Sequence, residues 1–355
     1  MDMEMSKKKP AFKISDTLRA YLIEYDREES IPLSYEDMKR WSDSLPVIDA
    51  NGNDTLWRSV MYPQMDQEEI FNGLREIYAL LKTDGDTSII NHLKISRIEY
   101  CLFGNSNPFR IKIVNMINDN HDYFYIKKAD ASRVYGLELE HILSPNRMSY
   151  IVDGNTLVED HIAGIPGDVF MESYMENSNF YPVGMAKEFV KFNERCFIML
   201  LGDMRSYNYV VDVTPDFDKE QYRARTIDFD QLCYEGRKNF YKPQFYKENM
   251  KIVQFCMETL TPETVFQYQH EERTLMKKRY HVARTRLTNL LNSMHDDVLS
   301  TDAKRDSLKK ELNEYHLTDK FSNCETMGQV LRLHLDLMLG KPKPKKPDVL
   351  ATYKV

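Results

Sequence analysis

The sequence lacks the segments and cysteine patterns that define several large classes of protein. Its 355 residues contain no run of eighteen apolar residues, so we expect no transmembrane helix and no membrane partner. Residues 1–10 are charged and lack the apolar core of a secretory signal. The five cysteines occur singly, without a C-x-x-C pair, which indicates neither a zinc site nor a disulfide framework and is typical of a reducing compartment. These absences favour a cytoplasmic protein.

Several common catalytic motifs and a strong charge of one sign are also missing. The chain has no G-x-S-x-G elbow, no H-E-x-x-H pair and no G-x-x-x-x-G-K-[ST] loop, and its nine histidines show no metal-ligand spacing. The net charge of −7, with both signs plentiful, indicates no nucleic-acid partner. The composition is 42% apolar and 12% aromatic, which suffices for a sizeable core in two or three lobes.

One stretch near the middle of the chain carries the clearest chemical signal. An apolar helix predicted over residues 185–199 leads into Gly202 and Asp203, and Asn208 follows five residues later. Two short strands joined by a turn would then place Asn208 beside Asp228. This set of groups suits phosphoryl transfer from a Mg-bound nucleotide, because Asp203 can accept a hydroxyl proton while the oxygens of Asn208 and Asp228 hold the metal.

The spacing resembles the catalytic and metal-binding loops of the protein-kinase-like superfamily, and more closely those of its aminoglycoside phosphotransferase and choline kinase branch. In that branch an Asp-x₄-Asn loop is followed by a strand and an Ile-Asp-Phe segment, as in residues 203–208 and 227–229 here. Two positions depart from the pattern: Leu201 replaces the usual His, and Asp230 replaces the Gly of protein kinases. The resemblance covers residues 95–260 and implies an α+β, two-lobed protein-kinase-like fold with ATP and Mg²⁺ as cofactors.

Arg205 lies two residues after Asp203, where many protein kinases place a lysine. The resemblance implies that this cation neutralises charge on the transferred phosphoryl group. A surface arginine is the alternative interpretation.

An antiparallel meander is predicted before this stretch. Residues 98–103, 109–113 and 123–128 read as strands joined by turns at 104–108 and 118–120. The first turn would cover the phosphates, but it is no G-x-G-x-x-G loop. By resemblance, Lys127 matches the strand lysine that pairs with nucleotide phosphates and with a helix glutamate. Lys128 is the alternative, because neighbouring strand residues point to opposite faces.

A short helix is predicted over residues 132–143, with Ser132 as its N-cap. Glu138 lies within its apolar stripe, where a carboxylate requires a partner that a lysine of the sheet would supply. Glu140, on the flank of the helix, is the alternative member of the pair.

The next segment reads as a β-hairpin over residues 148–158 with an Asp-Gly turn. Directly after it, Glu159, Asp160, His161 and Ile162 resemble the hinge of small-molecule kinases. The resemblance implies that backbone groups of these residues bind the adenine ring. An ordinary loop is the alternative interpretation.

We therefore expect an N-terminal helical extension (1–92), a nucleotide-binding lobe (93–160), a helical catalytic lobe (161–340) and a basic flexible tail (341–355). The expected activity is transfer of the γ-phosphate of ATP to a hydroxyl group of a small molecule or of a protein. A nucleotide-binding pseudokinase or scaffold is the main alternative. A helical interaction protein, in which Asp203 and Asn208 only form a cap and a turn, is a third. The basic residues within a long predicted helix over 276–294 are interpreted as a solvated face.

Overall fold

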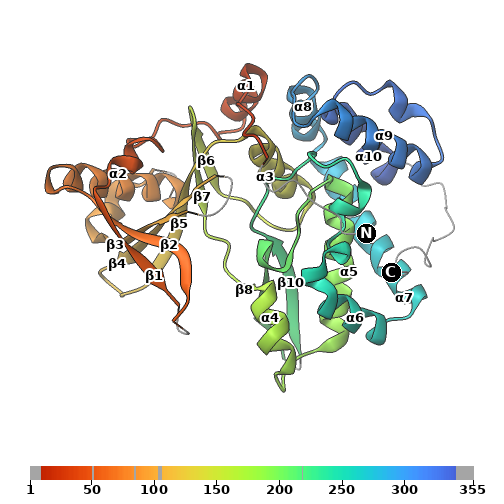
Figure 1. Cartoon of the computed structure of the whole chain (residues 1–355), viewed down its shortest axis with the longest axis horizontal. Coiled ribbons are helices and arrows are strands. Elements are labelled where there is room, and N and C mark those ends of the chain that lie inside the picture. The colour runs from red at the N-terminus through yellow and green to blue at the C-terminus, as the bar shows by residue number, and fades with distance from the viewer. Residues whose placement is uncertain (1–8, 50–51, 84, 103–105, 218, 341–355) are drawn as a thin grey trace. The chain divides into compact units, whose positions relative to one another are not determined.

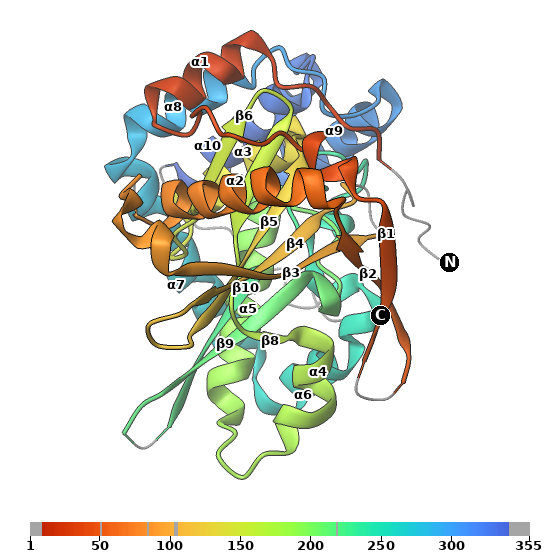
Figure 2. The ribbon, with the colours of Figure 1, turned by 90° about the vertical axis from the view of Figure 1, so that its left-hand side faces the viewer.

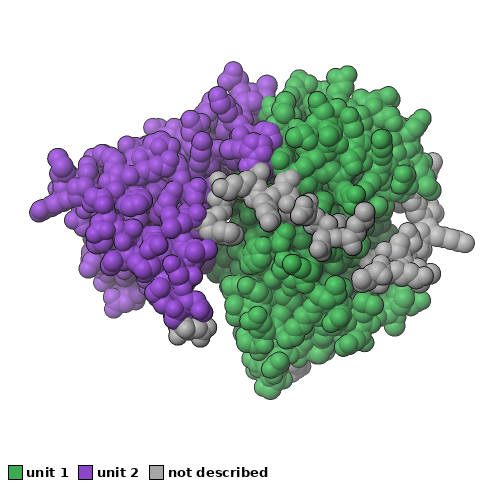
Figure 3. All heavy atoms as spheres, viewed as in Figure 1, with its two compact units in different colours: residues 1–5, 132–147, 162–355 green, residues 6–131, 148–161 purple. Residues whose placement is uncertain are grey.

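The computed structural model describes residues 9–49, 52–83, 85–102, 106–217 and 219–340 (Figure 1). Contacts within it divide the chain into two compact units, coloured separately in Figure 3. The sheet unit contains the described chain up to Ala131 together with Met148–His161, and the helical unit contains Ser132–Arg147 and the described chain from Ile162 onward. The predicted α+β class is confirmed. The units do not follow the predicted boundaries at residues 92 and 160, because the helix after Lys128 packs with the C-terminal helices.

The sheet unit is built on seven strands in the order β1-β2-β3-β4-β5-β7-β6, and all neighbouring pairs are antiparallel. The strands are β1 (Asp43–Ile48), β2 (Asp54–Met61), β3 (Leu93–Cys101), β4 (Phe109–Asn115), β5 (His121–Lys128), β6 (Tyr150–Asp153) and β7 (Thr156–Asp160). The predicted meander corresponds to β3, β4 and β5, and the predicted hairpin to β6 and β7. The turn between β3 and β4, proposed to cover the phosphates, lies partly outside the described residues.

Helices α1 (Asp16–Glu24) and α2 (Gln64–Thr83) agree with the predicted N-terminal helices, but β1 and β2 between them were not predicted. These two strands leave Leu45, Ile48 and Leu56 exposed. They therefore lack the alternation of apolar and polar residues by which a half-buried strand is recognised. The pairing of β2 with β3, and of β1 with β2, is what places them in the sheet.

Helix α2 runs across the sheet (Figure 2) and supplies the other half of the sheet unit's core. Ile70, Leu74 and Ile77 share one face of α2 and are fully buried in a cluster with Ile111 and Phe124 of the sheet. The helix residues spaced i, i+4, i+7 thus pack against alternate residues that point to one face of β4 and β5.

The helical unit contains α3 (Ala131–Leu143), α4 (Gly167–Ser173), α5 (Pro182–Met199), α6 (Met250–Thr259), α7 (Pro262–Val282), α8 (Arg284–Ser293), α9 (Asp302–His316) and α10 (Met327–Leu339). A small antiparallel sheet in the order β10-β9-β8 accompanies them, formed by β8 (Ile165–Pro166), β9 (Tyr209–Pro215) and β10 (Glu220–Thr226). No helix within the described ranges is long and apolar enough to cross a membrane.

Three local predictions in the helical unit are corrected. Ser132 is not an N-cap, because α3 already begins at Ala131. The predicted helix over residues 276–294 is divided at Ala283 into α7 and α8. The segment after Gly236, expected to be helical, forms three short 3₁₀ turns between Lys238 and Asn249 before α6 begins. Side chains of this segment, those of Tyr246, Glu248 and Asn249, instead form hydrogen bonds with the loop that carries Asp203.

Candidate active site

The loop that carries Asp203 begins at the C-terminus of α5. The buried helix ends at Leu200, which adopts a left-handed conformation (φ 51°). The Leu200 N–H donates to backbone carbonyls in the last turn of the helix. Leu201, at the position where the resembled family has His, is buried and forms an isolated antiparallel bridge with Leu232. This bridge brings the loop of Asp203 alongside the segment that carries Asp228 and Asp230.

Asp203 itself has a positive φ of 58°, which aspartate tolerates better than most residues. Three hydrogen bonds hold its backbone in place. Its N–H donates to the Tyr246 hydroxyl (2.9 Å), and its carbonyl accepts from the Arg205 N–H (2.8 Å) and from the Asn208 Nδ2 (2.7 Å). These three hydrogen bonds hold Asp203 in an uncommon backbone conformation, and such conformations are frequent at functional sites.

Asn208 and Asp228 are brought together by the register of two strands. In the β9–β10 pair Tyr209 lies opposite Thr226, so the residues that flank this pair leave the sheet at the same end. The N–H of Ile227 donates to the carbonyl of Asn208 (3.1 Å). Asn208 is nearly buried, and its bond to the Asp203 carbonyl fixes the orientation of its amide.

The Asp203 carboxylate lies among other charged groups. Its Oδ1 accepts a hydrogen bond from Arg205 Nε (2.9 Å), and Arg205 also donates to Glu248 (2.7 Å). Burial, followed by the negative charge of Asp228, raises the pKa of Asp203 to about 7, although Arg205 opposes the increase. A carboxyl with this pKa exchanges a proton readily near neutral pH, which is the requirement for a general base.

Asp228 is fixed by a residue that the sequence did not suggest. Arg133 of α3 donates to Asp228 (2.8 Å), to Asp230 (3.0 Å) and to the carbonyl of Ile227 (3.1 Å), and its side chain is only 2% exposed. The intervening Phe229 is fully buried against α3, where a Cβ on Gly136 would lie 2.9 Å from the Phe229 Cβ. Helix α3 therefore neutralises the aspartates of the predicted metal loop through Arg133, and it fixes the position of the loop by packing against Phe229.

The residues present fit a magnesium ion in chemistry and number. Asn208 and Asp228 offer an amide and a carboxylate oxygen, and Mg²⁺ bound with a nucleotide commonly takes one or two protein ligands besides phosphate oxygens and water. The repulsion between Asp203 and Asp228, seen in the pKa of Asp203, would be relieved by a cation near both. Among the described residues no group of three or more His, Cys, Asp or Glu side chains forms a metal site without the nucleotide.

In the sheet unit, Lys127 is buried (7% exposed) and donates to Glu159 at 2.7 Å, whereas Lys128 is exposed. The register explains this pair. Lys127 lies opposite Leu157, so Glu159 is its diagonal neighbour on the same face of β5 and β7.

Glu138 and Glu140 belong to the helical unit, and both are buried. Glu138 forms a bidentate ion pair with Arg286 of α8, with distances of 2.8 and 3.0 Å. Glu140 accepts a hydrogen bond from Asn146 (2.6 Å). The expectation that a carboxylate on the apolar face of α3 has a partner is met, but by an arginine 148 residues away instead of the sheet lysine.

The residues that resemble a hinge are divided between the units. Asp160 pairs with Lys82 (2.6 Å), and the Nδ1 of His161 lies 3.3 Å from the Tyr125 hydroxyl, both within the sheet unit. Burial lowers the pKa of His161, so the ring is largely neutral at pH 7. Ile162 begins the helical unit.

Sequence reasoning missed four residues that shape the site: Arg133, Tyr246, Glu248 and Asn249. Asn249 is fully buried and donates to the carbonyls of Met204 and Pro243 (2.8 Å each). Arg133 did carry a signal, because a cation in the first turn of a helix opposes the helix dipole and requires a nearby anion. The other three lie in an aperiodic segment that offers no pattern to read.

No protein-family model matches the chain, and no curated protein matches it either. Among solved structures, the chain is similar to "Titin kinase and its flanking domains" with 13% sequence identity and a TM-score of 0.24. That match covers 69% of this chain and 54% of the other, so it spans about half of the titin kinase chain.

Proposed function

We propose that the chain is an ATP- and Mg-dependent phosphotransferase of the protein-kinase-like kind, acting on a hydroxyl group of a small molecule or of a protein. The observation that carries the proposal is the convergence of Asp203, Asn208 and Asp228 in one loop region. Asn208 is hydrogen-bonded to Asp203 and adjoins Ile227, and the charge of Asp228 acts on the Asp203 carboxyl.

In this proposal each side chain has a distinct role. Asp203 orients the acceptor hydroxyl and takes its proton on a carboxylate oxygen, with a pKa suited to neutral pH. Arg205, held between Asp203 and Glu248, offers positive charge next to the transferred group. Asn208 and Asp228 would hold Mg²⁺, which when bound neutralises phosphate charge. Lys127, with Glu159, is the candidate contact for the α- and β-phosphates.

A nucleotide-binding scaffold is a second candidate, and one observation favours it. Arg133 already neutralises Asp228 and Asp230 through hydrogen bonds to both. Because a cation compensates the predicted metal ligand from within the protein, the fold does not require a metal ion to keep this loop in place.

The test compares the wild type with Asp203→Asn, Asp228→Asn and Asp230→Asn. ATP binding is measured by calorimetry with and without Mg²⁺, and ATP hydrolysis by release of phosphate. The phosphotransferase proposal expects Mg-dependent binding that weakens in Asp228→Asn, and turnover that is lost in Asp203→Asn.

Asp230→Asn is the matched control, because it removes a carboxylate from the same Arg133 cluster without removing a proposed metal ligand. It should retain Mg-dependent binding. Binding without turnover in the wild type would favour the scaffold. Absence of ATP binding in every form would refute both.

A further inference from the structure

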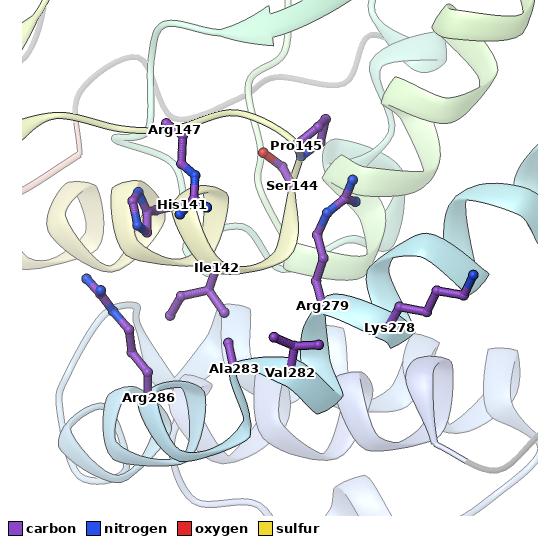
Figure 4. Close-up of a pocket in the computed structure, with 10 residues that line it drawn as sticks. All are labelled: His141, Ile142, Ser144, Pro145, Arg147, Lys278, Arg279, Val282, Ala283 and Arg286. Atoms are coloured by element: carbon purple, nitrogen blue, oxygen red, sulfur yellow. The ribbon is translucent and has the colours of Figure 1, made fainter.

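A concave site lies in the helical unit, and its lining does not include Asp203, Asn208 or Asp228. A cavity of 570 Å³ opens between the end of α3, the turn that follows it, and the junction of α7 and α8 (Figure 4). It is lined by His141, Ile142, Ser144, Pro145, Arg147, Lys278, Arg279, Val282, Ala283 and Arg286. Its volume falls within the range of about 300–1,000 Å³ that is typical of small-molecule sites.

The charge of the lining is entirely of one sign. Four of the ten lining residues are Arg or Lys, and none is Asp or Glu. In the part of the chain that the structure describes, no carboxylate lies within ion-pair distance of Arg147, Lys278 or Arg279. The cavity therefore has an excess of positive charge although the whole chain is acidic. This arrangement attracts anions.

Arg279 is the most informative of these cations. It is half-buried and extends from α7 toward the turn at Ser144 and Pro145 (Figure 4), where it makes a long hydrogen bond of 3.4 Å to the carbonyl of Leu143. Burial lowers the pKa of Arg279, and the nearby charges do not restore it. A desolvated guanidinium without a carboxylate partner is costly, so an external anion would stabilise it.

Arg286 and Ala283 line the cavity where α8 begins. The ion pair with the fully buried Glu138 anchors Arg286 in one orientation. Ala283 precedes α8, so the N-terminus of this ten-residue helix adjoins the cavity without a side-chain cap. The partial positive charge of this N-terminus is offset by the C-termini of α3 and α7 at the same cavity, so the cationic side chains account for the attraction of an anion.

Apolar side chains line part of the cavity. Ile142, Val282 and Ala283 offer no hydrogen bonds, and Val282 is 89% exposed at the surface. The cavity thus combines several cations with an apolar wall, which suits a ligand with a phosphate group attached to a carbon skeleton.

We propose that this cavity binds a small phosphorylated molecule, with its phosphate monoester held by Arg279 and its carbon skeleton against Ile142 and Val282. Arg147 and Lys278 extend on either side of Arg279 (Figure 4) and add positive charge around the phosphate. Arginine is suited to this role, because its planar fork matches the oxygens of a phosphate group. The site is separate from the proposed phosphotransfer loop, so it can be tested whether or not the chain turns over ATP.

The test uses phenyl phosphate, inorganic phosphate, phenol and a phosphoserine peptide as probes, without Mg²⁺ or nucleotide, at physiological salt. Binding to the full chain is measured by calorimetry and by saturation-transfer NMR. The wild type should bind phenyl phosphate more tightly than inorganic phosphate, and phenol not at all. Arg279→Gln should weaken phenyl phosphate binding about tenfold or more, as expected for hydrogen bonds between charged groups.

Two exposed positions keep the test valid if Arg279→Gln folds poorly. Arg147 and Lys278 are exposed, so Arg147→Gln and Lys278→Gln should fold normally and each weaken binding. Arg284→Gln is the matched control, since Arg284 is an exposed cation on α8 that does not line the cavity.

Four outcomes would overturn the proposal. The first is that phenyl phosphate does not bind at millimolar concentration, and the second is that the wild type and all three cavity variants bind it with equal affinity. The third is that Arg284→Gln loses as much affinity as the cavity variants. The fourth is that a phosphoserine peptide binds but phenyl phosphate does not. The third would indicate a diffuse charge effect, and the last a protein partner.

Discussion

The raised pKa of Asp203 leads to a quantitative prediction about stability. The folded protein holds this carboxyl protonated up to a pKa of about 7, whereas the ordinary value is 3.8. Between these values the folded state binds more protons than the unfolded state, so the contribution of Asp203 to the free energy of unfolding decreases as the pH rises. Between pH 5 and pH 8 the decrease is about 2–3 kcal/mol, at about 1.4 kcal/mol for each pKa unit.

The variant Asp203→Asn removes this titration while keeping the size of the side chain. Urea unfolding of the wild type and the variant is compared at pH 5, 6, 7 and 8. The free energy of unfolding of the wild type, relative to the variant, should fall between pH 5 and pH 7 and level off toward pH 8. The Arg205 ion pair adds no separate pH dependence, because it acts on the ionised carboxylate and is already contained in the pKa of Asp203.

Asp16→Asn is the control for the loss of one carboxylate, since Asp16 is exposed at the start of α1. Its difference from the wild type should stay constant from pH 5 to pH 8. A constant difference for Asp203→Asn as well would refute the argument that burial and Asp228 raise the pKa of Asp203. In Asp228→Asn the carboxyl resonance of Asp203, followed by ¹³C NMR, should titrate below pH 7 but above its ordinary value, because burial is the larger cause.

Three further changes test how α3 supports the site. Arg133→Gln leaves the aspartates of the metal loop without their guanidinium partner and should lower the free energy of unfolding by about 3 kcal/mol; a loss below 1 kcal/mol in urea titrations would contradict this. Glu138→Gln removes the charge that pairs with Arg286 and should cost about 3 kcal/mol, whereas Glu138→Gln combined with Arg286→Met should recover part of that loss in a double-mutant cycle. Gly136→Ala places a Cβ against Phe229 and should lower the melting temperature and weaken any Mg-dependent nucleotide binding; unchanged values for both would show that the loop adapts freely.

The sequence alone identified the elements whose signals are local. Alternation of apolar residues located β3 to β5, the Asp-Gly pair located the β6–β7 hairpin, and helical spacing located α3 and α5. The Asp203 loop and Asp228 were identified by their spacing, and their convergence followed from two short strands with a turn. In each case the information lies within about thirty residues, so no knowledge of distant segments was needed.

The tertiary structure alone decided which charged groups pair. Lys127 pairs with Glu159 through the register of β5 and β7, and Glu138 pairs with Arg286, 148 residues away. Arg133 reaches Asp228 across 95 residues, and the cationic cavity joins the end of α3 to α7 and α8. Periodicity tells which face of a helix or strand is buried, but it cannot tell which buried charges will face each other, because that depends on how distant elements pack.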